Sequence, residues 1–288
     1  MSSLPPTRPR AVFLDIDGTY ADHGLVPDAH VEAVELARSR GHRVFLCTGR
    51  PLAMIADRIL APGFDGVISG AGAHVEVGGE LLVDTRFDQD LADRVIDALD
   101  THNAAYILEA PHSLHGRRGV DLRLRDVLSP IFAAREQTHG RHGATVDPTA
   151  DILAPMQYAD DLRGTSFAKV SCFDSDTPLT EVVADLGPAV GLVPSSLSAL
   201  GDTAGEIYVS GIHKAVGIRV VQDYLGLLRE DIIAIGDSAN DLEMLRYAGI
   251  GVAVDGATPD VLAAADRTTG GPAEHGVAHA LAELGLLG

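Results

Sequence analysis

The chain has 288 residues and a formal net charge of −19 at pH 7, which argues against a nucleic-acid backbone or an anionic membrane as its partner. Its two cysteines, Cys47 and Cys172, exclude a disulfide framework or a zinc cluster, and both are predicted to be buried small apolar side chains. No apolar run approaches the ~20 residues that span a bilayer, and the first ten residues lack the apolar core of a secretory signal, so we expect a soluble cytoplasmic protein.

Strand and helix patterns alternate in the first third of the chain. Strands are predicted over 11–16, 43–47 and 66–69, and helices over 28–40 and from Pro51 to about residue 60. This β-α-β-α-β order is typical of a parallel sheet with helices on its faces.

The last third of the chain repeats this style. Strands are predicted over 231–236 and 250–254, and helices over 214–226, 239–247 and 258–265. The middle has weaker periodicity and more His, Arg and Asp, which indicates an inserted α+β lobe. We therefore predict an α/β fold with a Rossmann-like parallel-sheet core over 1–83 and 208–288, and an inserted α+β domain over 84–207.

The segment AVFLDIDGTY, residues 11–20, is the most informative part of the chain. Its apolar residues predict a buried strand that ends in two carboxylates, Asp15 and Asp17. Buried acids are costly unless they are neutralised, and a divalent cation is the simplest way to do so. A calcium loop would need Gly and Glu at the sixth and twelfth positions from Asp15, where this chain has Tyr20 and Val26, so that alternative is disfavoured.

Three further motifs fall at predicted strand ends or helix starts: TGR at 48–50, Lys214, and GDSAND at 236–241. The carboxyl ends of parallel strands share one edge of a sheet, so we expect these motifs to converge. Asp15 and Asp237 are predicted to bind Mg²⁺ there. Asp241 follows Asp237 by four residues, which predicts that it returns to the same face and acts one layer behind the metal ligands.

These residue types suit phosphoryl transfer. Asp15 is the candidate nucleophile, and Asp17 is the candidate general acid and base. Thr48 offers a hydroxyl to a phosphoryl oxygen, and Lys214 supplies a point charge. The predicted catalytic set is Asp15, Asp17, Thr48 and Lys214, and the predicted substrate-binding set is Thr48, Gly49, Arg50, Lys214 and Asn240. Each motif alone is also explained by a turn, a helix cap or a surface charge, so the prediction depends on their occurrence together.

As a set, these motifs resemble the haloacid dehalogenase superfamily of phosphohydrolases, and within it the Cof-type, class IIB subfamily. The resemblance covers about 11–73 and 206–280. It implies that Asp15 is the nucleophile, that Asp17 is the acid and base whose carbonyl also reaches Mg²⁺, and that Asp237 is a metal ligand. Thr48, Lys214, Asn240 and Asp241 match the remaining motif positions. It further implies that the inserted domain is a cap that closes over the site and selects the leaving group.

Three positions depart from the family pattern without touching a catalytic residue. Ala71 stands where the family often has Asn, and this puts the usual ligand geometry there in question. Tyr20 replaces a common aliphatic residue, and Ala215 replaces a common Gly.

A cluster of basic residues marks the middle of the chain: His112, His115, Arg117 and Arg118. Two interpretations are open. The cluster either meets a second anionic group of the substrate, or consists of exposed side chains paired with acids such as Asp121.

The function predicted from sequence is a Mg²⁺-dependent phosphatase. It hydrolyses a phosphate monoester of a small metabolite, a sugar phosphate or a phosphorylated cofactor, through an aspartyl-phosphate on Asp15. The alternatives are a phosphomutase or phosphotransferase that uses the same intermediate, and a non-catalytic protein that binds a phosphorylated ligand. A dehalogenase proper is disfavoured, because that chemistry needs neither Asp17 as an acid nor the metal-binding pair.

Overall fold

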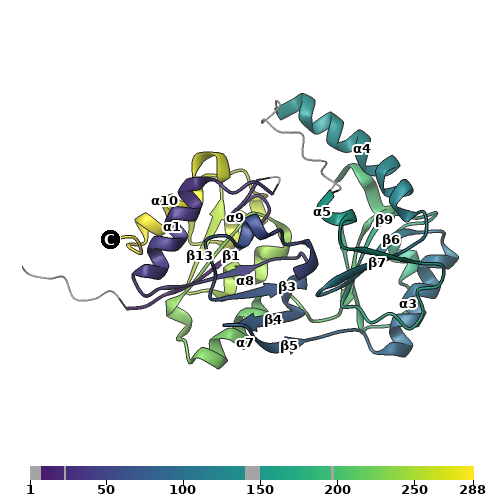
Figure 1. Cartoon of the computed structure of the whole chain (residues 1–288), viewed down its shortest axis with the longest axis horizontal. Helices are drawn as coiled ribbons and strands as arrows, with labels where there is room; N and C mark the ends of the chain where they lie inside the picture. The colour runs from purple at the N-terminus through teal and green to yellow at the C-terminus, as the bar shows by residue number, and fades with distance from the viewer. Residues whose placement is uncertain (1–7, 23, 140–149, 196–197) are drawn as a thin grey trace, which may run out of the picture. The chain divides into compact units, whose positions relative to one another are not determined.

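The computed structural model describes residues 8–22, 24–139, 150–195 and 198–288 (Figure 1). The chain divides into two compact units. The first comprises residues 1–50, 55–84 and 213–288, and the second comprises 51–54 and 85–212. Within the described ranges, no helix combines the length and the apolar character that crossing a membrane requires.

An eight-stranded sheet forms the centre of the first unit, in the order β14-β13-β12-β1-β2-β3-β4-β5. Six neighbouring strands, from β14 to β3, run parallel, and β4 and β5 add an antiparallel edge. Their bounds are β1 Ala11–Leu14, β2 Arg43–Cys47, β3 Gly66–Ser69, β4 His74–Val77, β5 Glu80–Asp84, β12 Ile232–Gly236, β13 Ile250–Val254 and β14 Arg267–Thr269.

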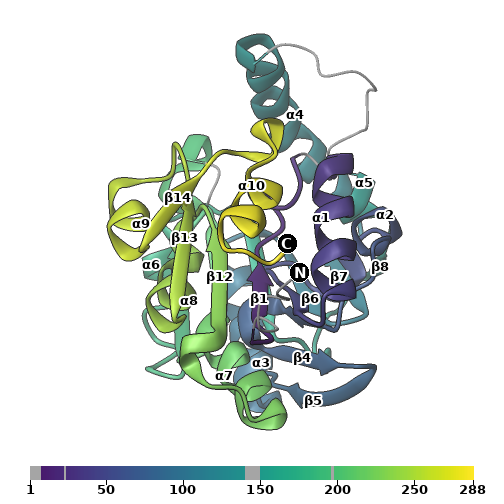
Figure 2. The ribbon, with the colours of Figure 1, turned by 90° about the vertical axis from the view of Figure 1, so that its left-hand side faces the viewer.

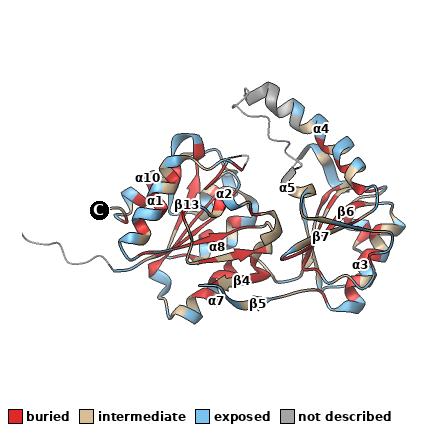
Figure 3. Ribbon diagram, viewed as in Figure 1, coloured by how far each residue is buried: buried red, intermediate tan, exposed pale blue. Residues whose placement is uncertain are grey.

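Helices pack on this sheet and bury its apolar strands, which Figure 3 colours red. The helices are α1 Asp28–Ser39, α2 Asp57–Leu60, α7 Lys214–Leu225, α8 Leu242–Tyr247, α9 Pro259–Ala264 and α10 Gly276–Glu283. Phe13 of β1 stacks on Phe45 of β2 with ring centroids 4.9 Å apart, and Ile218 of α7 and Met244 of α8 join the same core. Elsewhere, α1 packs against α10, and the two helices lie side by side in Figure 2.

The second unit is built on a six-stranded sheet in the order β10-β11-β9-β6-β7-β8. It is antiparallel except for the parallel pair β7 and β8. Its elements are α3 Gln89–Thr101, β6 Ala105–Ala110, β7 Ser113–Arg117, α4 Val120–His139, α5 Ala150–Leu153, β8 Met156–Ala159, β9 Lys169–Asp174, α6 Leu179–Val182, β10 Val190–Pro194 and β11 Gly205–Val209. Apolar residues of α3 and α6 cover the sheet, which gives this unit a core of its own.

The α/β prediction with a Rossmann-like parallel sheet is confirmed, and so are the strands over 43–47, 66–69 and 250–254. The continuous helix expected from Pro51 to residue 60 is wrong. A single 3₁₀ turn covers Leu52–Met54, and the extended backbone of Ala56 (φ −67°, ψ 147°) separates it from α2. The helix expected over 239–247 likewise begins as a 3₁₀ turn, Ala239–Asp241, before α8.

Candidate active site

The two central strands β1 and β12 bring acids from the two ends of the chain together. They pair in parallel, with Leu14 opposite Ile235, and each is followed by an aspartate. Asp15 comes after β1, and its backbone N–H donates to the carbonyl of Ile235 at 3.0 Å. Asp237 comes after β12. The carboxyl ends of these parallel strands therefore share one edge, where ligands bind in open α/β sheets.

A buried lysine joins two of the acids at this edge. The Nζ of Lys214, the first residue of α7, donates to Asp15 Oδ1 and to Asp241 Oδ1, both at 2.6 Å. Lys214 and Asp241 are fully buried, and Asp15 is 4% exposed. Burial alone lowers the pKa of Lys214, but the two carboxylates outweigh it and raise the pKa, so the ammonium group stays charged.

Asp241 is engaged on both sides of its carboxylate. While Oδ1 accepts from Lys214, Oδ2 accepts from the backbone N–H groups of Asp237 at 3.1 Å and Ser238 at 3.0 Å. Gly236 leaves space for the Asp241 side chain, because a Cβ at residue 236 would lie 2.4 Å from Asp241 Cγ. Asp241 thus fixes both Lys214 and the backbone that carries Asp237.

Asp237 is held by a threonine that the sequence analysis gave no role. Thr19 Oγ1 donates to Asp237 Oδ1 at 2.7 Å. Gly18, the residue after Asp17, adopts φ +83°, and a Cβ on it would lie 2.5 Å from Asp237 Oδ2. The DIDGT motif therefore needs its glycine for both backbone conformation and clearance. The sequence feature that could have indicated this role is the position of Thr19 in the DIDGT motif, two residues after Asp17.

The residues after β2 and those of the 3₁₀ turn 239–241 lie together. Thr48 is 1% exposed, and its Oγ1 accepts from the backbone N–H of Arg50 at 3.1 Å. A Cβ on Gly49 would lie 3.3 Å from Asn240 Nδ2, so the Asn240 amide stands beside Gly49. The structure thus brings together three of the residues predicted to bind substrate.

Arg50 makes a contact that the sequence did not indicate. Its guanidinium binds the Asp17 carboxylate with both arms, Nε to Oδ2 at 2.7 Å and Nη2 to Oδ1 at 2.6 Å. Half of the Asp17 side chain is exposed, whereas Asp15 is buried. The two acids of the DIDGT motif therefore have different surroundings, as two different chemical roles require.

The charge balance of the site favours a divalent cation. Asp15, Asp237 and Asp241 each offer a carboxylate oxygen, and these oxygens lie within 4.8 Å of one another. Lys214 is the ammonium group that contacts them, which leaves two negative charges uncompensated. Burial, together with the neighbouring acids, raises the pKa of Asp15, and it raises the pKa of Asp237 to about 6. Because Asp241 uses both its oxygens elsewhere, Asp15 and Asp237 are the carboxylates that fit a hard cation such as Mg²⁺.

The basic cluster of the second unit consists of engaged side chains. Arg117 Nε donates to Asp100 Oδ1 at 2.8 Å, and Arg118 pairs with Asp160 at 3.1 Å. His115 is hydrogen-bonded to Ser113 Oγ at 2.8 Å. These contacts favour the second interpretation of the cluster, with Asp100 and Asp160 as partners in place of Asp121.

Comparison with known proteins identifies the family. A profile of the haloacid dehalogenase-like hydrolases matches residues 12–281. The chain therefore belongs to the haloacid dehalogenase-like hydrolase family. Among its relatives is the 5-amino-6-(5-phospho-D-ribitylamino)uracil phosphatase YitU of Bacillus subtilis, which is 26% identical over 96% of this chain and 98% of its own length.

Solved structures share the fold over nearly all of the chain. A haloacid dehalogenase-like hydrolase from B. subtilis aligns with a TM-score of 0.77 at 22% identity, over 96% of this chain and 99% of its own. The subclass IIB sugar phosphatase BT4131 aligns with a TM-score of 0.74 at 24% identity, over 96% and 99%. The fold of this chain is therefore that of haloacid dehalogenase-like hydrolases with a cap domain.

Proposed function

We propose that the protein is a Mg²⁺-dependent phosphatase that hydrolyses phosphate monoesters of small metabolites through a phosphorylated Asp15. The observation that carries the proposal is the Asp15 carboxylate at the end of β1, 2.6 Å from a buried lysine and within 4.8 Å of the Asp237 oxygen. A carboxylate so placed can attack phosphorus while its own charge is balanced. Family membership and the phosphatase relatives support the same reaction class.

In the first step, Asp15 forms a bond to phosphorus while the ester oxygen leaves with a proton from Asp17. In the second step, Asp17 takes a proton from a water molecule, which attacks phosphorus and releases inorganic phosphate and free Asp15. Lys214 stays charged in both steps and stabilises negative charge on the phosphoryl group. Arg50 holds both Asp17 oxygens and orients the acid.

Asp15 and Asp237 would hold the cation, together with the Asp17 carbonyl, and Thr48 and the Gly49 amide would bind phosphoryl oxygens. A divalent cation at this edge supplies positive charge that brings a phosphate dianion to a protein of net charge −19. We further propose that the unit of residues 85–212 is the cap that selects the substrate. The sugar phosphatase and the ribityl-phosphate phosphatase among its relatives make sugar phosphates and phosphorylated cofactor precursors the first substrates to test.

The deciding experiment compares Asp15→Asn with a matched control, Asp223→Asn. Asp223 is an exposed acid of α7 in the same unit, outside the candidate site. A panel of sugar phosphates and ribityl phosphates is assayed for phosphate release with Mg²⁺ and with EDTA. We expect Asp15→Asn to abolish release with an unchanged circular dichroism spectrum, and Asp223→Asn to match wild type. Undiminished turnover by Asp15→Asn would reject the nucleophile.

The same assay separates the alternative functions. A phosphatase releases one phosphate for each substrate consumed when a single substrate is present. A phosphomutase converts the substrate to an isomer without equivalent phosphate release. A protein that only binds phosphorylated ligands gives no turnover with any member of the panel, and either of these last two results overturns the proposal.

A further inference from the structure

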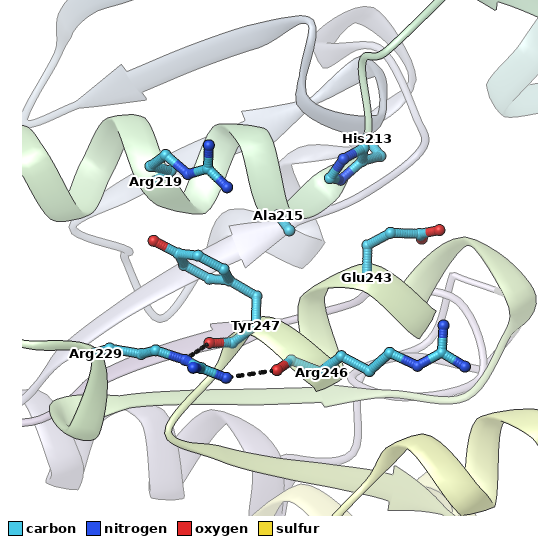
Figure 4. Close-up of a pocket in the computed structure, with 7 residues that line it drawn as sticks. All are labelled: His213, Ala215, Arg219, Arg229, Glu243, Arg246 and Tyr247. Atoms are coloured by element: carbon cyan, nitrogen blue, oxygen red, sulfur yellow. Dashed lines mark hydrogen bonds between the residues drawn. The ribbon is translucent and has the colours of Figure 1, made fainter.

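Most of the candidate site is positioned from within the first unit. Lys214 is the first residue of α7, Asp241 directly precedes α8, and these two helices pack against each other. Arg229 secures the end of α8, because its guanidinium donates to the carbonyl groups of Tyr247 at 2.5 Å and Arg246 at 2.8 Å (Figure 4). The contacts that hold Lys214 and Asp241 therefore lie in the first unit.

Arg50 differs, because the chain leaves the first unit directly after it. Residues 51–54 belong to the second unit, and the chain returns to the first unit at Ile55, which is 6% exposed. We call residues 51–54 the strap. The strap thus begins one residue after the arginine that binds both carboxylate oxygens of Asp17.

One backbone hydrogen bond and one side chain tie the strap into the second unit. The N–H of Ala53 donates to the carbonyl of Pro111 at 2.8 Å. Met54 packs against an apolar cluster built from β6, β7 and α4. The buried members of this cluster are Ile107, Leu114, Val120 and Leu124. Because removal of apolar surface from water is favourable, this packing stabilises the position of the strap within the second unit.

The strap is short and stiff enough to pass a displacement of Met54 on to Arg50. The N–H of Met54 donates to the carbonyl of Pro51 at 3.0 Å and closes a single 3₁₀ turn. Three residues of such a turn rise only about 6 Å, and the ring of Pro51 fixes its φ angle. On its other side, the carbonyl of Arg50 accepts from the N–H of Gly70 at 2.8 Å. The backbone of Arg50 is therefore set between an anchor in each unit.

From these contacts we propose that Met54 is a positioning residue for the proposed phosphatase reaction. By packing in the second unit, Met54 holds the strap, and the strap sets the guanidinium group that orients Asp17. An ion pair with a half-exposed carboxylate is weak by itself, so the place of Arg50 depends on its backbone. Asp17 is then aligned only while the second unit, the proposed cap, holds the strap. This inference rests on the proposed function for the role of Asp17 as the acid.

The first test needs no turnover and uses the full-length protein. It follows the Nε–Hε NMR signal of Arg50, which is assigned through its loss in Arg50→Lys. In wild type the bond from Nε to Asp17 Oδ2, at 2.7 Å, should slow exchange of this proton with water. Met54→Ala should accelerate the exchange at least about threefold, because the strap loses its side-chain anchor. Met54→Leu conserves the volume and should restore the wild-type exchange rate.

Met156→Ala is the matched control. Met156 of β8 packs against the same apolar cluster as Met54, but it lies outside the strap. Both alanine variants should therefore lower the melting temperature by similar amounts. Only Met54→Ala should change the Arg50 signal, so the comparison separates the strap from a general loss of packing in the second unit.

The second test compares kcat/KM for a sugar phosphate and for p-nitrophenyl phosphate, with Mg²⁺ and at a temperature where all variants are folded. An alcohol needs a proton from Asp17 as it leaves, whereas p-nitrophenolate leaves readily without one. Met54→Ala should lower kcat/KM about tenfold for the sugar phosphate and change it little for p-nitrophenyl phosphate. Met156→Ala should show no such difference between the two substrates.

Three results would overturn the role of Met54: an Arg50 exchange rate in Met54→Ala that equals wild type, equal changes of this rate in the two alanine variants, or equal losses of kcat/KM for the two substrates. A wild-type protein without turnover would instead reject the proposed function. In that case the NMR comparison would still decide whether Met54 holds Arg50 in place.

Discussion

Arg50 binds both carboxylate oxygens of Asp17, at 2.7 and 2.6 Å, although the two residues lie on different loops of the same sheet edge. An exposed ion pair of this kind contributes little to stability, since half of the Asp17 side chain is in solvent. Its value is geometric, because the planar guanidinium fixes the orientation of the carboxylate. In the proposed reaction, that orientation determines whether Asp17 reaches the leaving oxygen.

Arg50→Lys tests this positioning role. A lysine keeps the positive charge but loses the two-armed contact, so we expect kcat to fall about tenfold to a hundredfold through misplacement of the acid. The melting temperature should change little. Comparison of kcat with KM by steady-state kinetics checks the prediction: a rise in KM alone would instead assign Arg50 to substrate binding.

In the proposed function, Asp237 would make Mg²⁺ binding dependent on pH. Burial raises its pKa to about 6, and a cation can bind only its ionised form. Below about pH 6, protons therefore compete with the metal at Asp237, and the dissociation constant for Mg²⁺ should rise at least about tenfold per pH unit, because the pKa of Asp15 is raised as well. Calorimetric titration of Mg²⁺ between pH 5 and 8 measures this directly. An affinity that stays constant over this range would contradict the prediction.

His30 joins the loop after β1 to the last helix, α10. This buried residue of α1 donates from Nδ1 to the carbonyl of Tyr20 at 2.9 Å, and its Nε2 accepts from the backbone N–H of Val277 at 3.2 Å. Only the neutral ring can make both bonds, because a protonated ring has no acceptor. Burial accordingly lowers the pKa of His30 below its usual 6.5.

The free energy of unfolding should therefore fall in mild acid. Below pH 6.5 the unfolded chain takes up a proton at His30 that the folded chain does not, and stability declines by up to about 1.4 kcal/mol per pH unit. At higher pH both states are neutral, and this dependence vanishes. His30→Gln should show a shallower slope than wild type in urea unfolding between pH 5 and 8. Parallel pH profiles of the two proteins would refute the role of His30.

Ala71 occupies a backbone conformation that suits another residue. Its φ of 56° and ψ of 30° are left-handed, a region that costs a residue with a Cβ about 1 kcal/mol. Asn tolerates this region well, which gives a backbone reason for the Asn that the family often has here. Ala71→Gly should raise the free energy of unfolding by about 0.5–1 kcal/mol. Ala73→Gly, at φ −71°, is the control and should lower it.

The sequence predicts the first unit well because short apolar runs that end in Gly or Asp leave few choices of structure. The strands at 43–47 and 250–254 were predicted to the residue. The helix after Pro51 was not, because nothing in its composition marks the extended backbone of Ala56. In the middle of the chain, strands such as β7 (SLHGR) and β8 (MQYA) mix polar and apolar residues, so no apolar run marks them and only a general α+β character could be predicted.

For the candidate site, the positions of Asp15 and Asp237 after predicted strands, and of Lys214 at a predicted helix start, were enough to group the three residues. The pairing of Arg50 with Asp17, and the engagement of both oxygens of Asp241, were not foreseeable. Those contacts depend on side-chain rotamers and on loops whose paths sequence spacing does not define.

The central position of β1 has a consequence for synthesis of the protein. Ala11 pairs on one side with Arg43 and on the other with Ile232. During translation, at about 5–20 residues per second, the second neighbour arrives about 10 to 40 seconds after the first. Throughout that interval an apolar edge of the nascent sheet lies open. A chain that ended before residue 214 would be an aggregation-prone fragment that carries Asp15 but lacks both Lys214 and Asp237.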